Sequence, residues 1–475
     1  MNNNPSLEKT SDHFTIAEMI SGKIPFICTT QITDFQYIIE NLPLQSTLSK
    51  RYLFSQKYMR EPQKIENELN NIDFVLRWKQ NNVQKAEKIN FLLSQFRDIE
   101  KTFQNLHNNL ILNDIDFFEI KNFAFLTQEI HILCQDIPFF KIANLDKIVI
   151  LLDPQNTHSQ GFYIYDDYSS ELAILRKQMR ENSQNDTDLI TQCIEIEDNI
   201  RIKLSQNLQP FAEKLLQNSA QIAYLDILFA KAHQINDLQL CRPQTAVEKT
   251  VYQKIFNPLI KNILQSKSKE YQPIDIELEN APILLTGINM GGKTVLLRTL
   301  ALCQTLYQFG FFVPSRSACI VPKDGLRLSM EDNVNATSGL SSFALEIKRL
   351  SSILDEINEG KSLLVLLDEP ARSTNPEEGR AIVMAVLKIL AEKHVNSCVT
   401  THYDCINIAA KQLRVKGLKD THNSHSINDL LNNIDYSLTE TKEINAPHEA
   451  LSIAKLLNIN KELLSIAEEI LSIEK

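Results

Sequence analysis

The segment from Gly287 to Thr294 reads GINMGGKT and matches the phosphate-binding pattern GxxxxGK[ST]. The backbone N–H groups of such a glycine-rich turn, together with the positive end of the helix that follows, surround phosphate oxygens. Lys293 would reach the β and γ oxygens, and the hydroxyl of Thr294 would bind Mg²⁺. An apolar run precedes the segment and a helical pattern follows it, which disfavours a chance glycine turn. The predicted chemistry is the binding of a nucleoside triphosphate with Mg²⁺.

An acidic pair, Asp368 and Glu369, ends a second apolar run further along the chain. At the carboxyl edge of a sheet, Asp368 would hold Mg²⁺ directly or through water, and Glu369 would orient or deprotonate the attacking water. An acidic pair that stands alone after a strand more often belongs to a solvated loop. The phosphate-binding pattern upstream makes hydrolysis of the triphosphate the favoured interpretation.

Two weaker signals complete the candidate residues. The sequence TTHY from Thr400 to Tyr403 ends another apolar run and would place His402 near the γ-phosphate as a sensor. A lone histidine after a strand is usually structural. Residues 338–343 form a small-residue loop before a helical stretch that carries Glu346. On local grounds an ordinary helix-capping turn explains this loop equally well.

The C-terminal half is predicted to carry these residues on the loops of an α/β domain. After Pro273, short apolar runs bounded by turn residues predict buried parallel strands with helices between them. The strands are expected at 283–285, 363–367 and 398–400, and the helices at 294–308 and 379–393. This alternation is typical of a nucleotide-binding domain.

The N-terminal half is predicted to be largely helical. It holds only two of the eleven glycines, Gly22 and Gly161, and glycine is the residue that most often interrupts helices. Apolar spacings of three and four between residues 48 and 135 predict amphipathic helices. A short β-like patch is expected at 148–152 and 162–165, and residues 170–232 are expected to form a helical arm and its return.

Composition narrows the class of protein. A chain of 475 residues is too long for one compact core, so two or more domains are expected. The net charge of −10 argues against a protein that acts mainly by neutralising nucleic-acid phosphates. The eight cysteines are far apart and show no zinc-ligand spacing, which predicts reduced thiols. No signal segment or membrane-spanning run is visible, so a cytoplasmic location without membrane contact is expected.

Taken in order, the four segments resemble the motifs of the MutS family of ABC-type ATPases. Residues 286–294 are similar to that family's TGPNMGGKS loop and residues 341–343 to its STF motif. Residues 368–374 are similar to its DEIGRGT motif, and residues 401–403 match its THY motif. The resemblance implies an ATPase that uses ATP and Mg²⁺ as its cofactors.

The resemblance also implies roles for individual residues. The ATP-binding residues would be Gly287, Asn289, Met290, Gly291, Gly292, Lys293 and Thr294, with Ser341 reaching the nucleotide of the partner subunit. Thr294 and Asp368 would bind Mg²⁺, and Glu369 and His402 would be catalytic. Pro370 and Ala371 replace the Ile-Gly of the family motif, and residues 375–378 replace its usual polar loop, which puts the rate and coupling of hydrolysis in question.

The likeness extends over most of the chain and implies a domain plan. Segments similar to the family's helical core, lever and closing helical segment begin at residues 48, 167 and 449. The implied fold is multidomain α and α/β, with a helical core-and-lever domain followed by a P-loop ABC-type ATPase domain and a C-terminal helical segment. The expected bounds are 1–47 for an N-terminal leader, 48–245 for core and lever, 246–440 for the ATPase domain and 441–475 for a dimerisation segment.

Some family features are not expected here. Mismatch-reading and connector domains have no counterpart before residue 48, and residues 181–223 are too few for a β-rich DNA clamp at the lever tip. Residues 117–119, FFE, match the mismatch wedge by letter, but they fall in a helical core pattern and are interpreted as packing residues.

We therefore expect a dimeric switch with composite ATP sites, formed by a homodimer or by a heterodimer with a related subunit. Three clients compete: a protein partner, DNA, or none in the case of a scaffold with little turnover. Short MutS-like chains also occur beside cobalamin-dependent lysine and ornithine aminomutases, so reactivation of such an enzyme is the candidate function. DNA-structure or mismatched-DNA binding in repair or recombination is the alternative, and DNA binding is expected to be weak and non-specific.

Overall fold

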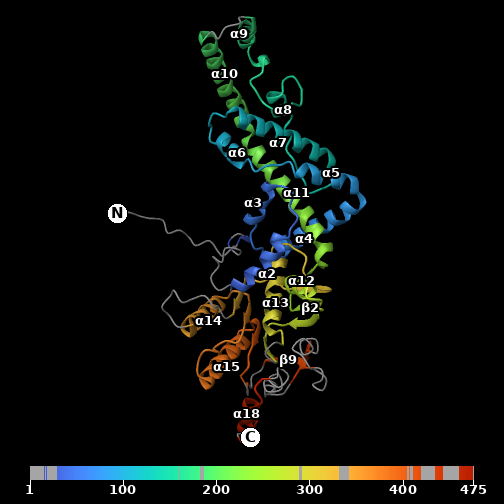
Figure 1. Cartoon of the computed structure of the whole chain (residues 1–475), viewed down its shortest axis with the longest axis vertical. Coiled ribbons are helices and arrows are strands. Elements are labelled where there is room, and N and C mark those ends of the chain that lie inside the picture. The colour runs from blue at the N-terminus through green and yellow to red at the C-terminus, as the bar shows by residue number, and fades with distance from the viewer. Residues whose placement is uncertain are drawn as a thin grey trace, which may run out of the picture. The chain divides into compact units, whose positions relative to one another are not determined.

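The computed structural model describes residues 15–16, 18, 29–159, 161–181, 187–287, 291–330, 342–403, 406, 410–418, 434–441 and 459–473 (Figure 1). These residues form two compact units. The first, unit 1, consists of residues up to Leu42, residues 56–70 and the chain from Gln234 onward. The second, unit 2, consists of residues 43–55 and 71–233. The predicted domain boundaries at residues 47, 245 and 440 divide the chain into consecutive segments. Unit 1 instead combines segments that are separate in sequence, so the predicted boundaries stay a prediction.

Unit 2 is helical, as the apolar spacing predicts. Its helices are α3 (Thr47–Ser55), α5 (Val83–Leu93), α6 (Glu100–His107), α7 (Asp114–Leu133), α8 (Asp146–Leu152), α9 (Ser170–Glu181) and α10 (Thr187–Leu208), with most of α4 (Pro62–Asn81) and α11 (Ala212–Leu238). The side chain of Asn113 caps α7 by accepting the N–H groups of Ile115 and Asp116. Phe117 is fully buried and Glu119 accepts a hydrogen bond from Thr102 at 2.7 Å, so FFE forms part of the helical packing.

The predicted β-like patch is wrong. Residues 148–152 belong to helix α8, and residues 162–165 form no strand. A short apolar run has the same hydropathy in a buried strand and in a buried helix, so its sequence pattern cannot separate the two. Ile148 and Leu152, one helical turn apart, are both buried, while Ile150 is exposed. Burial at a spacing of four is the pattern of a helix with one packed face.

The helical prediction for residues 170–232 is confirmed for the described part of that range, and its role as an arm and return stays a prediction. Helices α9 and α10 pack against each other and only residues 182–186 separate them in sequence. The short 3₁₀ helix η2 (Gln209–Phe211) then leads from α10 into α11 (Figure 1). Another 3₁₀ turn, η1 (Asp166–Tyr168), precedes α9 and packs against it.

Unit 1 contains a six-stranded, mostly parallel sheet. Its strands are β4 (Pro282–Thr286), β6 (Gly325–Ser329), β7 (Leu363–Leu367), β8 (Asn396–Thr400), β9 (Lys411–Leu418) and β10 (Ile434–Glu440). Their order is β10-β9-β4-β8-β7-β6, and β10 alone among them pairs antiparallel. The three predicted strands are confirmed as β4, β7 and β8.

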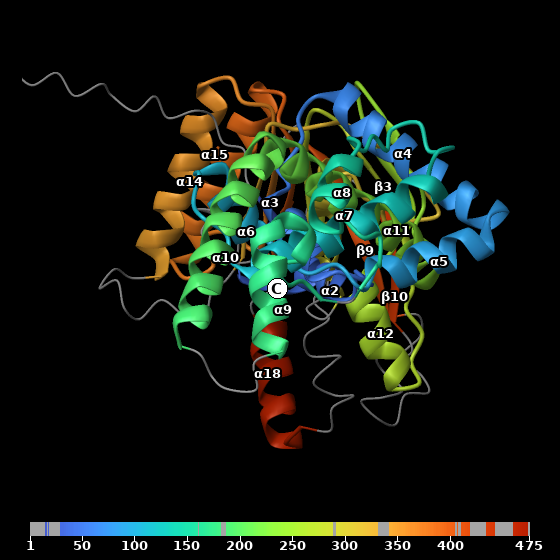
Figure 2. The same cartoon turned by 90° about the horizontal axis from the view of Figure 1, so that it is seen from above.

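Helices cover this sheet. These are α13 (Lys293–Gln308), α14 (Ser342–Asn358) and α15 (Pro376–Glu392). Alternate β7 residues Leu363, Val365 and Leu367 pack with α14 and α15, which lie side by side in both views (Figure 1, Figure 2). All five residues of β7 are buried, so both faces of the strand are covered, and α13 packs against β6, β7 and β8. Burying each large aliphatic side chain contributes about 1.5–3 kcal/mol.

A second, four-stranded sheet completes unit 1. Its strands are β1 (Gln244–Thr245), β2 (Thr250–Ile255), β3 (Ile274–Leu278) and β5 (Ser317–Ile320), in the order β1-β5-β2-β3. Among its described residues, unit 1 also contains α2 (Thr29–Glu40), α12 (Pro258–Ser266), α18 (Lys461–Ile473) and the ends of α4 and α11. Among the described residues, no helix is both long and apolar enough to span a membrane.

Candidate functional site

Three loops that carry predicted site residues meet at one edge of the six-stranded sheet. Strands β4, β8 and β7 are adjacent and parallel, with Leu285 opposite Thr400 and Leu367 opposite Val399. Their carboxyl ends therefore lie together, followed by Gly287, by Thr401 and by Asp368. In open α/β sheets this edge is where ligands bind.

The lysine of the phosphate-binding pattern is held inside this edge. Helix α13 begins at Lys293, directly after Gly292, whose φ of 76° is a left-handed conformation that favours glycine. The ammonium Nζ of Lys293 donates to the carbonyl oxygen of Gly287 at 2.7 Å, and the residue is only 6% exposed. Burial lowers the pKa of Lys293, while the nearby carboxylates of Glu369 and Asp368 act in the opposite direction. Residues 288–290 lie outside the described residues, so the roles of Asn289 and Met290 stay predictions.

The two predicted Mg²⁺ ligands lie in contact. The hydroxyl Oγ1 of Thr294 donates to Oδ2 of Asp368 at 2.7 Å. Hydroxyl and carboxylate oxygens are the donors that Mg²⁺ prefers, usually with several waters and the phosphates of the substrate. The residues present therefore fit the predicted cation.

Buried Thr400, to which the sequence pattern assigned no role of its own, fixes this acidic pair. Thr400, at the end of β8, donates from Oγ1 to Oδ1 of Asp368 at 2.7 Å. Oγ1 of Thr400 also accepts a hydrogen bond from the backbone N–H of Glu369 at 2.8 Å. One hydroxyl thus sets the orientation of the Asp368 carboxylate and the backbone position of Glu369.

Glu369 lies among two cationic side chains and one histidine. Its carboxylate is 3.8 Å from Nζ of Lys293, 3.4 Å from Nη1 of Arg372 and 3.7 Å from Nδ1 of His402. The Glu369 side chain is 17% exposed, whereas that of His402 is 43% exposed. His402 is therefore at the site, in contact with the carboxylate predicted to activate water, and its role as a phosphate sensor stays a prediction.

The turn after Glu369 is strained and is held from two sides. Ala371 has a φ of 61°, a conformation that costs an L-residue with a Cβ roughly 1–2 kcal/mol. Its N–H donates to Oε1 of Glu346 on α14 at 2.8 Å, and its carbonyl accepts from the Tyr403 hydroxyl at 2.7 Å. A Cβ on Gly379 would lie 2.1 Å from that hydroxyl, so the position must be glycine while Tyr403 keeps this place. We infer that these contacts fix the turn and thereby Glu369.

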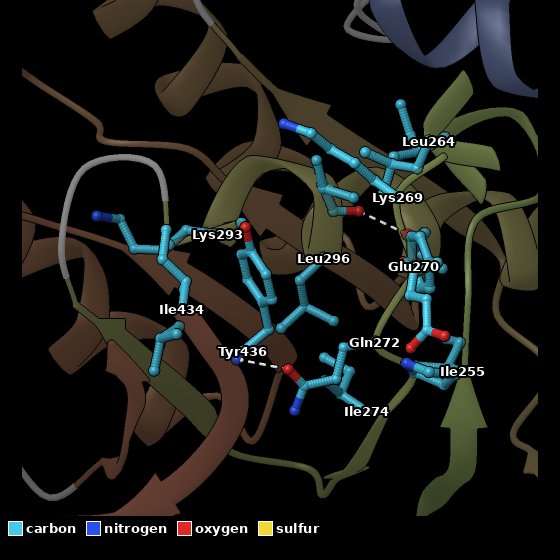
Figure 3. Close-up of a pocket in the computed structure, with 18 of the residues that line it drawn as sticks. Ile255, Leu264, Lys269, Glu270, Gln272, Ile274, Lys293, Leu296, Ile434 and Tyr436 are labelled. Carbon is cyan, nitrogen blue, oxygen red and sulfur yellow. Dashed lines mark hydrogen bonds between the residues drawn. The ribbon is translucent and has the colours of Figure 1, made fainter. Parts of the chain in front are cut away.

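A cavity of about 810 Å³ opens beside the phosphate-binding loop (Figure 3). Gly292 and Lys293 border it, and a Cβ on Gly292 would lie 3.2 Å from the ring of Tyr436. The backbone N–H of Tyr436 donates to Oε1 of Gln272 at 3.0 Å, and burial raises the pKa of the Tyr436 phenol. Further lining side chains are Ile255, Ile260, Leu264, Tyr271, Ile274, Leu296, Thr299, Ile434 and Leu438. The size and partly apolar lining are typical of small-molecule binding sites.

The contacts of some named residues could not be predicted from sequence pattern, and Ser341 cannot be placed. Thr400, Glu346 and Tyr403 act on segments far away in sequence, and the cavity joins α12, α13 and β10. An aromatic residue in a strand, such as Tyr436, carries no local signal of ligand contact. Ser341 lies outside the described residues, directly before α14.

Comparison with known proteins agrees with this geometry. Residues 283–473 match the family model described as MutS domain V. The chain is 32% identical over 254 residues to Endonuclease MutS2 of Thermus thermophilus, an alignment that covers 53% of this chain and 32% of that protein. It is 30% identical over 263 residues to the DNA mismatch repair protein MutS of Clostridium kluyveri, covering 54% of this chain and 30% of that protein. These alignments span about a third of each relative.

The chain therefore contains a MutS-type ATPase domain and is homologous to MutS and MutS2 proteins. The family resemblance seen in the motifs is confirmed at this level. The truncated plan and the link to aminomutases find no support in these comparisons.

We predict that Thr400→Val lowers the rate of ATP hydrolysis and destabilises the fold. The change removes a donor from Asp368 and an acceptor from the Glu369 N–H, and each buried polar group left unpaired costs about 1–3 kcal/mol. Thr400→Ser keeps the hydroxyl and is the matched control. Phosphate release and thermal denaturation measure the two effects, and a valine variant with the kinetics of the serine variant would contradict the role of the hydroxyl.

We predict that Gly379→Ala slows hydrolysis about tenfold while leaving the dissociation constant for ATP within about twofold, because the new methyl group displaces Tyr403 from Ala371. A tenfold loss corresponds to about 1.4 kcal/mol of transition-state stabilisation. Arg380→Ala, at the exposed neighbouring position of the same helix, is the control. Single-turnover hydrolysis and nucleotide titration separate the two parameters. Equal weakening of binding and turnover would show that the turn serves the whole site rather than Glu369.

Proposed function

We propose that this chain binds and hydrolyses Mg²⁺–ATP at the carboxyl edge of its six-stranded sheet. The observation that carries the proposal is the 2.7 Å hydrogen bond from Thr294 to Asp368. It joins the first turn of the phosphate-binding helix to the end of β7, as shared coordination of one cation requires. Such convergence of segments far apart in sequence is the arrangement of P-loop ATPases.

Each residue has a separate role in the proposed reaction. Lys293 and the N-terminal N–H groups of α13 bind the phosphates, and Thr294 and Asp368 hold Mg²⁺, which neutralises charge on the transferring phosphoryl group. Glu369 orients the attacking water and accepts its proton. The cavity beside Tyr436 takes the base.

The site is further proposed to be completed by a second subunit. The family resemblance assigns Ser341 to the partner's nucleotide, and α14, which follows Ser341, also carries Glu346. Glu346 accepts the N–H of Ala371 at 2.8 Å, so the helix that begins directly after Ser341 contacts the turn that follows Glu369. A homodimer, or a heterodimer with a related subunit, would thus form composite sites. ATP binding would favour one of two conformations and hydrolysis would restore the other.

The client of this switch has two candidates. The relatives named above are an endonuclease and a mismatch-repair protein, which supports DNA. The charge of the α9–α10 arm supports a protein client, as in reactivation of an aminomutase. Arg176 contacts Asp166 and Glu197, and Arg201 contacts Asp114. These arginines are paired with carboxylates on α10, η1 and α7, and they offer little attraction to a phosphate backbone.

We predict that Lys293→Ala abolishes tight ATP binding, whereas Glu369→Gln keeps it and abolishes turnover. The first change removes the cation that faces the phosphates, and the second alters only the group that activates water. Lys388→Ala, on an exposed side chain of α15, controls for loss of a positive charge. Nucleotide titration and phosphate release are the measurements. Similar loss of affinity in both site variants would contradict this division of roles.

We predict that any binding to duplex DNA is weak, falls steeply between low and physiological salt, and shows no preference for a mismatch. Release of condensed counterions gives this salt dependence when contacts are limited to the backbone. Fluorescence-anisotropy titrations of two duplexes that differ only in one mismatched pair measure it. A preference of tenfold or more, about 1.4 kcal/mol, would instead favour DNA as the client.

A further inference from the structure

Helix α2 lies against both helices that border the nucleotide cavity. It packs on α13, which carries Lys293, and on α12, whose residues Ile260 and Leu264 line the cavity. Neither ATP binding nor hydrolysis, as proposed above, assigns any role to α2. Its contacts nevertheless reach the helix on which phosphate binding depends.

The strongest of these contacts is a buried ion pair. Asp34 is fully buried, and its two carboxylate oxygens accept from Nε and Nη2 of Arg298 at 2.7 and 2.5 Å. Two parallel hydrogen bonds of this kind fix both the distance and the orientation of the partners. Arg298 lies four residues after Thr294, which places it one turn further along the same face of α13. The ion pair therefore holds α13 close to its phosphate-binding end.

Three weaker contacts join α2 to the end of α13, to α12 and to α11. The rings of Phe35 and Phe309 stack with their centroids 5.6 Å apart. Phe309 directly follows the last residue of α13. Asn262 of α12 donates to the Tyr37 hydroxyl at 3.2 Å. The side chain of Gln234 donates to the carbonyl of Ile38 at 2.7 Å. Helix α2 thus contacts α13 through Arg298, the residue directly after α13 through Phe309, and α12 through Asn262.

We propose that α2 is a positioning element of the ATP site, so that docking of α2 and binding of ATP stabilise each other. The inference rests on the proposed function of the site. Asp34 acts through Arg298 and is a positioning residue, since it is not among the described residues that line the cavity. Coupling between two binding events is reciprocal: if docked α2 raises the affinity for ATP, ATP must favour docked α2 by the same factor.

The test compares Asp34→Asn with Glu356→Gln in the full chain. Glu356 forms a second, largely buried pair with Arg327, with its carboxylate Oε1 2.8 Å from Nε, and neither residue lines the cavity. Both variants are expected to melt at a lower temperature, because each leaves an arginine short of its counter-charge. Asp34→Asn alone is expected to raise the dissociation constant for ATP about tenfold, with turnover at saturating ATP changed less than twofold.

Hydrogen exchange supplies the reciprocal measurement. ATP is expected to slow exchange of the α2 amides in the wild-type chain, and to slow it less in Asp34→Asn. Lys293→Ala should show the unliganded α2 exchange rate with or without ATP. Tyr37→Phe, which removes a single partly exposed hydrogen bond, is a milder variant that keeps the test valid if Asp34→Asn fails to fold. It should raise the dissociation constant by about twofold.

The outcomes separate this inference from the proposed function. If the wild-type chain binds ATP while α2 exchange is unchanged, or if the α2 variants bind ATP as tightly as the Glu356 control, the coupling is overturned and the ATP site stands. If the wild-type chain does not bind ATP, the proposed function fails and the coupling fails with it.

Discussion

The rest of the site depends on the carboxylate of Asp368 at the end of β7. One of its oxygens accepts from Thr294 and the other from Thr400, so a single side chain joins the ends of β7 and β8 to the first turn of α13. Parallel pairing makes this possible, because it brings the carboxyl ends of neighbouring strands together. The hydrophobic packing of α14 and α15 on β7 keeps that strand in register. The chemistry is therefore positioned by the sheet, and the loops supply the reacting groups.

Much of this arrangement could be predicted from local sequence. Lys293, Thr294, Asp368 and Glu369 belong to patterns with fixed spacing beside apolar strands, and the structure brings them together. Thr400 could not be assigned, because its role comes from strand order, and β8 lies between β4 and β7 although it follows both in sequence. The misassigned strand at 148–152 failed for a related reason: tertiary packing, not hydropathy, decides whether a short apolar run is helical.

The departure from the family motif at Ala371 illustrates how strain is compensated. Glycine would adopt the left-handed conformation freely, whereas alanine in this conformation must be stabilised by contacts with other residues. Glu346 and Tyr403 provide it through two hydrogen bonds to the same residue, and Gly379 leaves space for the tyrosine. Strained residues of this kind persist where surrounding contacts over-determine them, often at functional sites. Alanine at position 371 therefore makes the turn more dependent on its contact with α14 than the glycine of the family motif would.

The charges around Lys293 indicate why nucleotide binding would change the site. Burial disfavours the ammonium form and lowers the pKa of Lys293, and the carboxylates of Glu369 and Asp368 offset only part of that effect. A triphosphate would bring its own negative charge to the same cation. Lys293 could then remain charged without its contact to Glu369, since phosphate oxygens would replace the carboxylate as its partners. Glu369 would thereby be released to face water only when the phosphates are in place, which links the timing of hydrolysis to the occupancy of the site.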